Sequence, residues 1–583
     1  MANSIRRMRG LAGVSLLGLL FLAAPLQAAI RVSVEGLDGE LLANVEALLS
    51  LKAPDLDPGL SEVRLRQLFV RGRREIARAL EPFGYYRPVI DADMARDGND
   101  WRIRYRVDPG EPVRIERLRI QILGEGAEDP KLGAPVDKPG LAEGDVADHR
   151  RYEALKRRLM NRALDLGYLE ARWQTSELRV DAAAGRAEVV LVLETGPRFL
   201  FGPVRFPDDV PLDRAMLQRY VPFRAGEPFS NRGLLALTRA LEDSDYFASV
   251  EVHAEPERAI NRAVPVRVEL VPRKRHKYTA GIGFGTDTGA RLRLGWAHRR
   301  INRAGHRMEA GLRLSQIGHE ASLAYSIPLK NPRTDRAVID AATRRKETDT
   351  STSRIRRLGL NRTRVLGDWL QTLAVEYHDE DFEVGGEADS SRLLLPQAGW
   401  SRVRAAKRID PRRGERVDLS VRGSWASLLS DVSFLQLRAS GKWVRSLGER
   451  TRLLTRLDAG TTWANDFAAL PASLRFFAGG DQSVRGFGLS TLGPTDSDGQ
   501  VVGGRHLLVG SLELERQVRG PWRAALFVDG GNAFDGLRDD LALGAGVGLR
   551  WVSPVGPLRV DLAVAVSEPE RPLRLHITLG PDL

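Results

Sequence analysis

The chain has 583 residues, of which 43% are hydrophobic and 28% charged, and its mean hydropathy is −0.27. These values exclude a membrane protein built from many spanning helices, because each such helix needs about 20 consecutive apolar residues. The absence of cysteine excludes disulfides, thiolate catalysis and a cysteine-ligated zinc site. Basic residues exceed acidic ones by 88 to 76, which gives a net charge of +12, and the 57 glycines favour turn-rich β structure.

Residues 1–28 have the pattern of a secretory signal peptide. Three arginines within residues 6–9 form a basic start, Leu11–Leu22 is apolar, and small residues follow up to Ala28. The apolar stretch is short for a transmembrane anchor. We therefore expect cleavage after Ala28 and export to the periplasm, to the medium or into an outer membrane as strands.

One pattern occurs three times between residues 30 and 275. Each copy has apolar residues at helical spacing, then a turn that contains tyrosine, then two segments with the alternation of strands. The turn tyrosines Tyr85, Tyr168 and Tyr246 stand 83 and 78 residues apart, a period too long for a solenoid unit. Each copy can form a small β-α-α-β-β domain with its helices on one face of a sheet. We place these domains at residues 29–110, 111–197 and 198–275.

From residue 276 to 583, strand-like alternation replaces the helical spacing. In one stretch Leu558, Val560 and Leu562 share a face, while Arg559 and Asp561 lie on the other. A membrane-spanning strand needs about 9–11 residues, so this region is long enough for roughly 14–18 of them. A soluble sandwich or propeller would also alternate. The signal peptide, the single apolar face and a final strand favour an outer-membrane β-barrel.

One segment of this region resembles a known family. Leu474–Gly488 reads LRFFAGGDQSVRGFG, and its Val484, Arg485, Gly486 and Phe487 resemble the inward-folded loop of the outer-membrane assembly-factor superfamily. Members of that superfamily join periplasmic POTRA domains, which are β-α-α-β-β modules, to a C-terminal barrel of 16 strands. The resemblance therefore implies three α+β POTRA repeats followed by a 16-stranded antiparallel barrel from residue 276 to 583.

Further segments are similar to the TamA branch of that superfamily. They are YTAGIGFGTDTG at Tyr278–Gly289, GWAHRRINRAG at Gly295–Gly305, FVDGGN at Phe527–Asn532, GLRWVSPVGPL at Gly548–Leu558 and ITLGPDL at Ile577–Leu583. Three POTRA repeats also fit this branch, whereas the BamA type usually has five.

Arg485 would need carboxylate partners inside a barrel, because a guanidinium is costly to bury alone. Leu512 and Leu514 point to one face of their strand and Glu513 to the other, and Asp529 lies opposite the apolar face of the next strand. In the superfamily this arginine is held by acidic residues on two neighbouring late strands. We therefore expect Arg485 to bridge Glu513 and Asp529; the alternative is that both carboxylates merely line a wet lumen.

The sequence has no motif of an enzyme: no nucleophile elbow, HExxH or phosphate loop occurs. Gly281, Gly283 and Gly285 superficially resemble a nucleotide fingerprint, but no helical spacing follows, which favours a membrane strand. The histidines lack ligand spacing. We expect no enzymatic activity, cofactor, metal or nucleic-acid partner, and we attribute the arginine excess to the lumen and to outer-membrane lipids.

The same three glycines suggest a weak seam in the predicted barrel. Gly281, Gly283 and Gly285 lie on its first strand, which must close against Leu573–Leu579, and glycine weakens a strand. The resemblance implies that incoming outer-membrane proteins, autotransporters among them, are templated at this seam together with TamB, an inner-membrane-anchored periplasmic protein. The open alternatives are a general BamA-type insertase, a two-partner secretion pore, a passive porin and a lipid-transport role with TamB.

Overall fold

The structure is a computed structural model that describes residues 30–54, 56–57, 60–98, 100–137, 139–405, 410–536, 539–553 and 556–579. The predicted signal peptide lies outside the described residues. The chain divides into two compact units, of which the first holds residues 1–201, 225–232 and 256–264, and the second holds 202–224, 233–255 and 265–583. None of the described helices is both long enough and apolar enough to cross a membrane.

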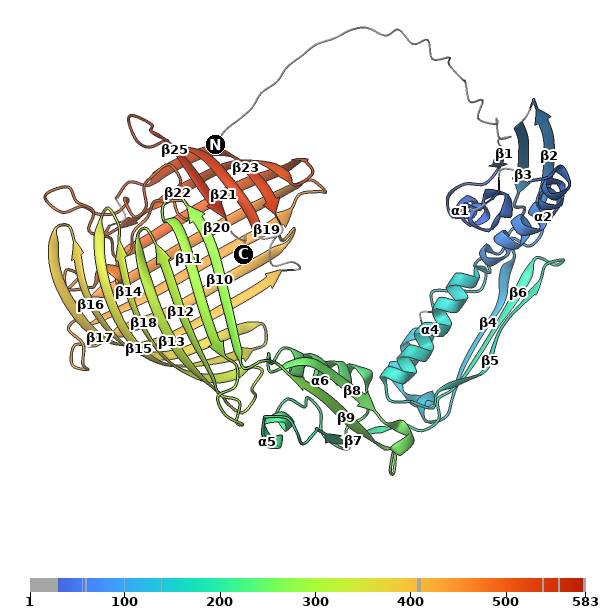
Figure 1. Ribbon diagram of the computed structural model, residues 1–583, viewed down its shortest axis with the longest axis horizontal. Coiled ribbons are helices and arrows are strands. Elements are labelled where there is room, and N and C mark those ends of the chain that lie inside the picture. The colour runs from blue at the N-terminus through green and yellow to red at the C-terminus, as the bar shows by residue number, and fades with distance from the viewer. Residues whose placement is uncertain are drawn as a thin grey trace, which may run out of the picture. The chain divides into compact units, whose positions relative to one another are not determined.

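Three small α+β domains come first along the chain (Figure 1). The first has strands β1 Ile30–Glu35, β2 Val89–Asp97 and β3 Asp100–Asp108, with helices α1 Gly39–Leu48 and α2 Glu62–Leu80. The second has β4 Arg114–Leu123, β5 Arg172–Asp181 and β6 Arg186–Glu194, with α3 Pro130–Asp137 and α4 His149–Asp165. The third has β7 Leu200–Arg205, β8 Phe247–Ala254 and β9 Ala263–Pro272, with α5 Arg214–Gln218 and α6 Asn231–Glu242.

The three sheets share one topology. Their strand orders are β1-β3-β2, β4-β6-β5 and β7-β9-β8, so the last strand of each domain lies in the middle. In the first two sheets the middle strand pairs parallel with the first strand and antiparallel with its hairpin partner. This arrangement confirms the β-α-α-β-β plan predicted for the three repeats.

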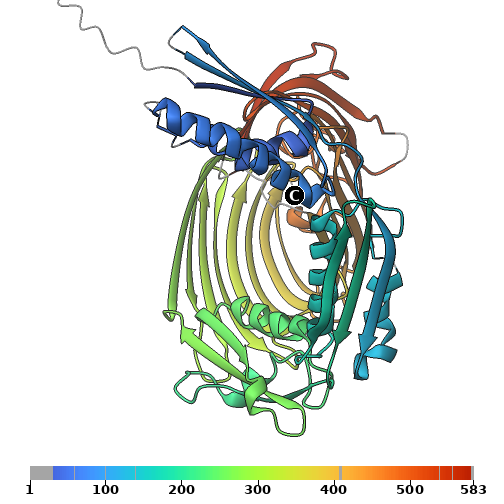
Figure 2. The same ribbon diagram turned by 90° about the vertical axis from the view of Figure 1, so that its right-hand side faces the viewer.

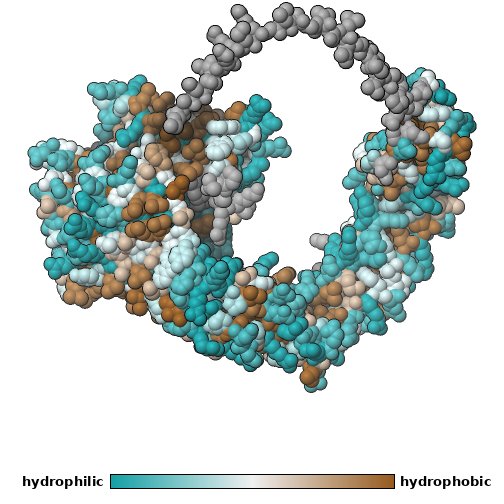
Figure 3. Space-filling view, viewed as in Figure 1, coloured by the Kyte–Doolittle hydropathy of each residue, from teal (hydrophilic) through white to brown (hydrophobic). Residues whose placement is uncertain are grey.

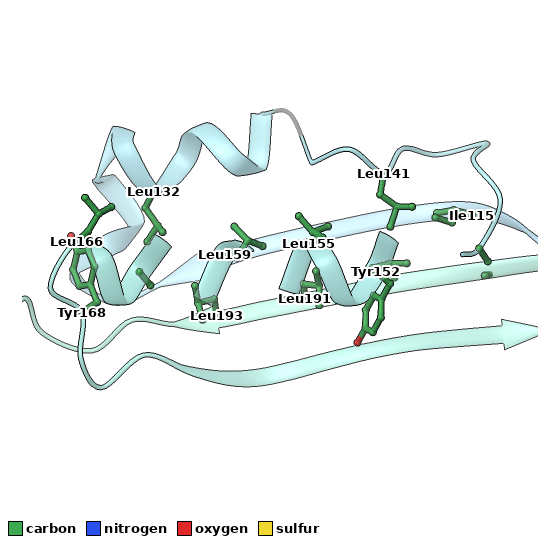
Figure 4. Packing of buried hydrophobic residues seen from close by; sticks show 14 of the residues in the cluster. Ile115, Leu132, Leu141, Tyr152, Leu155, Leu159, Leu166, Tyr168, Leu191 and Leu193 are labelled. Atoms are coloured by element: carbon green, nitrogen blue, oxygen red, sulfur yellow. The ribbon is translucent and has the colours of Figure 1, made fainter. Parts of the chain in front are cut away.

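The second domain shows how the sequence pattern builds such a unit. Asp148 precedes α4 and its carboxylate accepts a hydrogen bond from the backbone N–H of Arg150 at 2.8 Å, which caps the helix start. Leu155 and Leu159 are four residues apart and so lie on one face of α4. They pack against alternate residues of β6, including Leu191 (Figure 4). Each such leucine stabilises the domain by about 1.5–3 kcal/mol when it is fully buried.

The second unit contains a closed barrel of 16 antiparallel strands, as predicted (Figures 1 and 2). Its strands follow one another around the barrel in chain order. They are β10 His276–Gly285, β11 Gly289–His298, β12 Arg307–Ser315, β13 Gly318–Pro328, β14 Asp335–Glu347, β15 Ser351–Leu366, β16 Trp369–Val384, β17 Glu387–Ala405, β18 Gly414–Ser424, β19 Phe434–Ser446, β20 Thr451–Ala464, β21 His506–Arg519, β22 Trp522–Phe534, β23 Ala542–Ser553, β24 Gly556–Ala565 and β25 Leu573–Leu579.

The outer wall of the barrel is apolar. Leucines at alternate positions of the strands are exposed, and apolar side chains gather on the wall in the space-filling view (Figure 3). Exposed tryptophans lie at both ends: Trp522 and Trp551 where β22 begins and β23 ends, and Trp425 and Trp463 at the opposite end. Aromatic residues at both rims of an apolar band are typical of a barrel that spans an outer membrane.

The third small domain binds the turn between β11 and β12. Asp245, between α6 and β8, accepts hydrogen bonds from Arg273 and Arg299, both at 2.9 Å. Burial alone would raise the pKa of Asp245, but the hydrogen bond and charge of Arg299 hold this pKa below its ordinary value. Next to it, Tyr246 donates a hydrogen bond to the carbonyl of Gly305. The start of the barrel is thereby fastened to the domain that precedes it.

Replacing Asp245 by asparagine should loosen this attachment. Asp245→Asn keeps the shape and tolerates the positive φ of 59°, but it removes the charge that both arginines contact, at a cost of about 1–2 kcal/mol. We expect faster trypsin cleavage of the connection between β9 and β10 in the folded full-length chain. Asp243→Asn, two residues away and exposed, should leave the cleavage rate unchanged; equal acceleration in both variants would contradict the prediction.

Candidate functional site: a loop anchored inside the barrel

Residues 465–505 connect β20 to β21 and fold against the inner wall of the barrel. The segment makes antiparallel bridges to itself between Phe476 and Gly504 and between Ala478 and Leu492. Its buried apolar residues share one cluster with inward-facing residues of the late strands, and the members are Phe476, Ala478, Val484, Phe487, Leu507, Val509, Ala533, Ala542 and Ala565. We call residues 465–505 the inner loop.

Arg485 anchors the inner loop to the wall at the two predicted residues. Its Nε and Nη2 donate hydrogen bonds to the two carboxylate oxygens of Asp529 at 2.7 and 2.9 Å, and its Nη1 donates to Glu513 at 2.7 Å. All three side chains are buried. Asp529 also accepts the backbone N–H of Arg485 at 3.1 Å. This bidentate geometry fixes both the position and the orientation of the guanidinium.

The structure adds partners that the sequence analysis did not identify. Asp561 on β24 accepts from Arg485 at 3.2 Å, and the guanidinium carbon lies 3.5 Å from the centre of the Phe527 ring. Arg550 on β23 then bridges Glu513 at 2.7 Å and Asp561 at 2.5 Å. Asp561 already stood on the polar face of its strand in the sequence, but strand alternation alone does not tell which inward carboxylate a distant loop reaches.

A further set of charges continues the network along the wall. Arg452 on β20 donates to Glu515 at 2.7 Å and to Asp410 at 2.8 Å. Arg523 binds both oxygens of Asp410 at 2.7 Å, and Arg550 lies 3.4 Å from Glu515. Because cations and carboxylates alternate through these contacts, each buried charge is compensated, which the low dielectric of the interior requires.

Glycine next to the anchor lets the loop approach the wall closely. Gly486 has a φ of +99°, and a Cβ there would lie 2.9 Å from the backbone nitrogen of Ala565. On the wall, a Cβ at Gly544 would lie 1.9 Å from the carbonyl oxygen of Arg485. A side chain at either position would push the loop away. Gly486 beside Arg485 and Gly544 on β23 are therefore part of the anchor.

The inner loop has a second anchor, in which Glu380 of β16 binds Ser473. The fully buried Glu380 accepts hydrogen bonds from the backbone N–H of Ser473 at 3.1 Å and from its hydroxyl, and also from the hydroxyl of Ser353 at 2.7 Å. Nearby, Gln436 of β19 donates to the carbonyl of Leu474 at 2.8 Å. Because β16 and β22 are far apart in the strand order, the loop is held on separate parts of the wall.

His378 lies between Glu380 and a second glutamate. Its Nε2 is 2.9 Å from Glu380 and its Nδ1 is 3.2 Å from Glu376, and Arg357 lies 3.7 Å from Glu376. An imidazole with a carboxylate on each nitrogen is best satisfied when both nitrogens carry protons.

Nothing in the sequence spacing pointed to the anchor formed by Glu380 and Ser473, because these two residues meet only through the path of the loop.

The predicted seam is closed by few hydrogen bonds. β10 and β25 pair only at Gly285 and Thr578, next to which Thr286 donates its backbone N–H to Ile577 at 3.1 Å. Gly281 and Gly283 lie on β10 without a paired residue on β25. By comparison, β24 and β25 pair at seven positions. The junction is therefore the weakest in the wall.

The inner loop also contacts both sides of this seam. The backbone N–H of Asp481 donates to Asp287, just after β10, at 2.5 Å. The backbone N–H of Gly486 donates to Nε2 of His576 on β25 at 3.1 Å. The loop that carries Arg485 thus links the two strands that barely pair with each other.

One group of potential metal ligands lies outside the barrel. Glu251, His253 and Glu269 on β8 and β9 bring one ligand atom each within 4.8 Å of the others. All three side chains are exposed, and exposed acidic residues commonly gather on a strand surface without an ion. This group does not belong to the site formed by the loop.

Comparisons with known proteins match both parts of the chain. Residues 279–581 match the model of the Omp85 superfamily domain, and residues 31–109 match that of the POTRA domain TamA domain 1. The structure is similar to BamA from Haemophilus ducreyi lacking POTRA domains 1–3, at a TM-score of 0.66 and 16% identity, over 80% of this chain and 99% of that one. It also matches CdiB from Acinetobacter baumannii, at a TM-score of 0.45 and 13% identity, over 90% of this chain and 99% of that one.

A curated relative matches over a shorter stretch. Outer envelope protein 80, chloroplastic, from Arabidopsis thaliana is 36% identical over 100 residues. That stretch is 15% of this chain and 12% of the relative, so the chain spans about an eighth of the length of the protein that it matches.

Removing the charge of Asp529 should release the inner loop near Arg485. Asp529→Asn leaves a buried guanidinium with too few carboxylates, which costs about 3–5 kcal/mol. We expect proteases to cleave the loop at least tenfold faster in the folded barrel. Asp458→Asn removes a carboxylate of the β20 wall that is 4.0 Å from the nearest arginines, and cleavage there should match the unchanged protein. If Asp529→Asn cleaves no faster than this control, Asp529 does not anchor the loop.

Ser473→Ala should free the inner loop only near residue 473, where Glu380 holds it. It removes a hydrogen bond to a buried carboxylate, worth about 1.5–3 kcal/mol, and leaves the contacts of Arg485 intact. Hydrogen exchange followed by mass spectrometry should show faster exchange in peptides around residue 473 and unchanged exchange around residue 485. Ser497→Ala, at an exposed position of the same loop, is the control. Faster exchange along the whole loop would mean that the two anchors act as one.

Proposed function

Because this chain belongs to the Omp85 superfamily, we propose that its barrel inserts or secretes outer-membrane proteins by pairing their strands at the seam between β10 and β25. Proteins of this superfamily have the barrel in the outer membrane and the POTRA domains in the periplasm, and the chain has this plan. The observation that carries the proposal is the single pair of Gly285 and Thr578, which leaves most of both strands without a partner across the seam.

Unpaired backbone groups at the seam can bind an extended chain. A strand edge offers a row of N–H and C=O groups that pair with an incoming strand. On β10, Tyr278 and Ile282 are 76% and 87% exposed, and their apolar side chains face the lipid side of the wall. An incoming strand would extend the ladder from β10 and bury these side chains, and completed clients would leave sideways into the bilayer. The proposal includes no enzymatic step and no cofactor.

We further propose which periplasmic partner and which client proteins this barrel serves. The TamA-type first POTRA domain supports a partnership with TamB and the assembly of autotransporters among other clients. The described residues form three POTRA-like sheets, whereas the BamA type usually has five, which favours this proposal over a general insertase. A two-partner secretion pore and a lipid-transport role with TamB remain the competing functions.

Purification of the tagged full-length chain from outer membranes in mild detergent separates these functions. A single large inner-membrane-anchored periplasmic partner would support the TamB proposal. Small lipoproteins would favour a general insertase instead, and one secreted exoprotein would favour a dedicated pore. Autotransporter secretion and outer-membrane lipid content, measured after deletion of the gene, would then separate protein assembly from lipid transport.

Locking the seam should stop assembly. The chain has no cysteine, so Gly285→Cys/Thr578→Cys introduces one disulfide between two residues that already face each other. We expect at least a tenfold loss of client assembly in reconstituted membranes under oxidising conditions, and recovery on reduction. Leu419→Cys/Ala439→Cys joins paired strands remote from the seam and should leave assembly unchanged. Full activity of the oxidised seam variant would contradict strand pairing at this junction.

A further inference from the structure

A cavity of about 470 Å³ lies beside the seam. Residues of β10, β11, β12, β13 and β14 line it, together with Leu579 of β25. The third POTRA domain precedes β10 and is periplasmic, so the last residues of β10 approach the extracellular end of the barrel. The cavity therefore lies in the outer half of the wall, next to the junction that opens most easily.

Basic side chains from three strands line this cavity in two rows. The strand register places Arg293 of β11 directly opposite Arg313 of β12, and the same row continues through Glu320 to Arg344 of β14. The second row contains Arg291 and ends at Lys346. Alternation places these side chains opposite the lipid-facing leucines of their strands, so both rows point into the barrel.

Part of this charge has no ion pair within the described residues. Arg313 lies 3.3 Å from Glu320, the one carboxylate among the lining residues. Within the described parts of the chain, Arg291, Arg293 and Arg344 are in no ion pair. Like charges directly opposite each other on neighbouring strands destabilise a sheet. An anion bound beside Arg293 and Arg313 would therefore relieve their repulsion.

Two seam glycines leave room for such an anion. Gly281 and Gly283 of β10 are paired with Arg293 and Arg291. A Cβ at Gly281 would meet nothing within 4 Å, and one at Gly283 would touch only the guanidinium of Arg291, at 3.7 Å. These two positions of β10 therefore place no side chain between the arginines and the seam. The glycines that predicted a weak seam thus also open it toward the cations.

From these contacts we infer that the cavity binds the phosphate groups of an outer-leaflet lipid. Several guanidinium groups with no carboxylate partner match phosphate oxygens, which they bind through paired hydrogen bonds. On the opposite, lipid-facing side of the same strands, Ile282 and Leu292 also line the cavity, together with Leu579 of β25. These apolar side chains suit the acyl chains of a lipid whose headgroup reaches through the seam, and they are of no use to a free anion. The lipid headgroup would enter through the seam and neutralise the two rows. This inference rests on charge and register, independently of the proposed client chemistry.

Binding of a diphosphorylated lipid A by the full-length chain in mild detergent tests the inference. Arg293→Gln/Arg313→Gln should weaken binding at least tenfold, and Arg293→Lys/Arg313→Lys, which keeps the charge but loses the planar fork, should weaken it less. The matched control is Arg416→Gln/Arg438→Gln, which removes two arginines from other strands of the same barrel. Heat-modifiable migration on gels establishes that each variant is a folded barrel.

The possible results of this binding experiment separate a lipid site from other ligands. Tight binding of the diphosphorylated lipid, weaker binding of its dephosphorylated form and loss only in the Arg293 and Arg313 variants would support the site. Inorganic phosphate that binds as tightly as the lipid would overturn the lipid assignment. An acidic peptide that binds while the lipid does not would overturn it as well, as would equal loss in the control variant. Client assembly should be measured in parallel with the same variants. Lipid binding can be lost while assembly continues, or kept while assembly fails, so the two proposals are tested separately.

Discussion

Burial of one guanidinium organises the inner part of this barrel. Arg485 is withdrawn from water, and an isolated buried charge is so costly that the structure must bring carboxylates to it. Those carboxylates, Glu513, Asp529 and Asp561, come from three strands, so the position of the loop and the register of the late strands determine each other. A buried ion pair adds little net stability, but breaking it is expensive. The network therefore specifies where the loop lies more than it strengthens the fold.

The position of the inner loop has its largest consequence at the seam between β10 and β25. β10 and β25 contribute one pair of residues to each other, whereas the inner loop contacts Asp287 on one side and His576 on the other. The loop is itself held through Arg485 and, on another part of the wall, through Glu380. Closure of the barrel thus depends on hydrogen bonds from backbone N–H groups of the loop to side chains on both sides of the seam, as well as on a backbone ladder. Such contacts can be exchanged for those of another chain without unfolding any strand.

The features that could be predicted are those that follow from a repeat between neighbouring residues, such as the alternation of a strand. Alternation placed Glu513 and Asp529 on the inner face because Leu512 and its neighbours had to face lipid, and the repeats predicted three domains because each carries its own core. The contacts of Asp561 and Glu380 with the inner loop depend instead on which strands this long loop passes, and no local pattern in the sequence records that path. The single pair at the seam depends on how the strands tilt and shift around the barrel, which is a property of closure as a whole.

The arginines that point into the barrel fall into two groups, which differ in burial and in their charged neighbours. Arg485 of the inner loop and Arg452 and Arg550 of the late strands are buried, and each lies against carboxylates. On the first strands Arg291 and Arg293 are exposed, and Arg293 lies opposite Arg313 across the ladder. Water screens exposed charges, so this second arrangement is tolerable in an empty lumen, but screening falls once a lipid or a client strand fills the seam. An anion that enters beside β10 would then offset this charge, as we infer for the phosphate groups of a lipid.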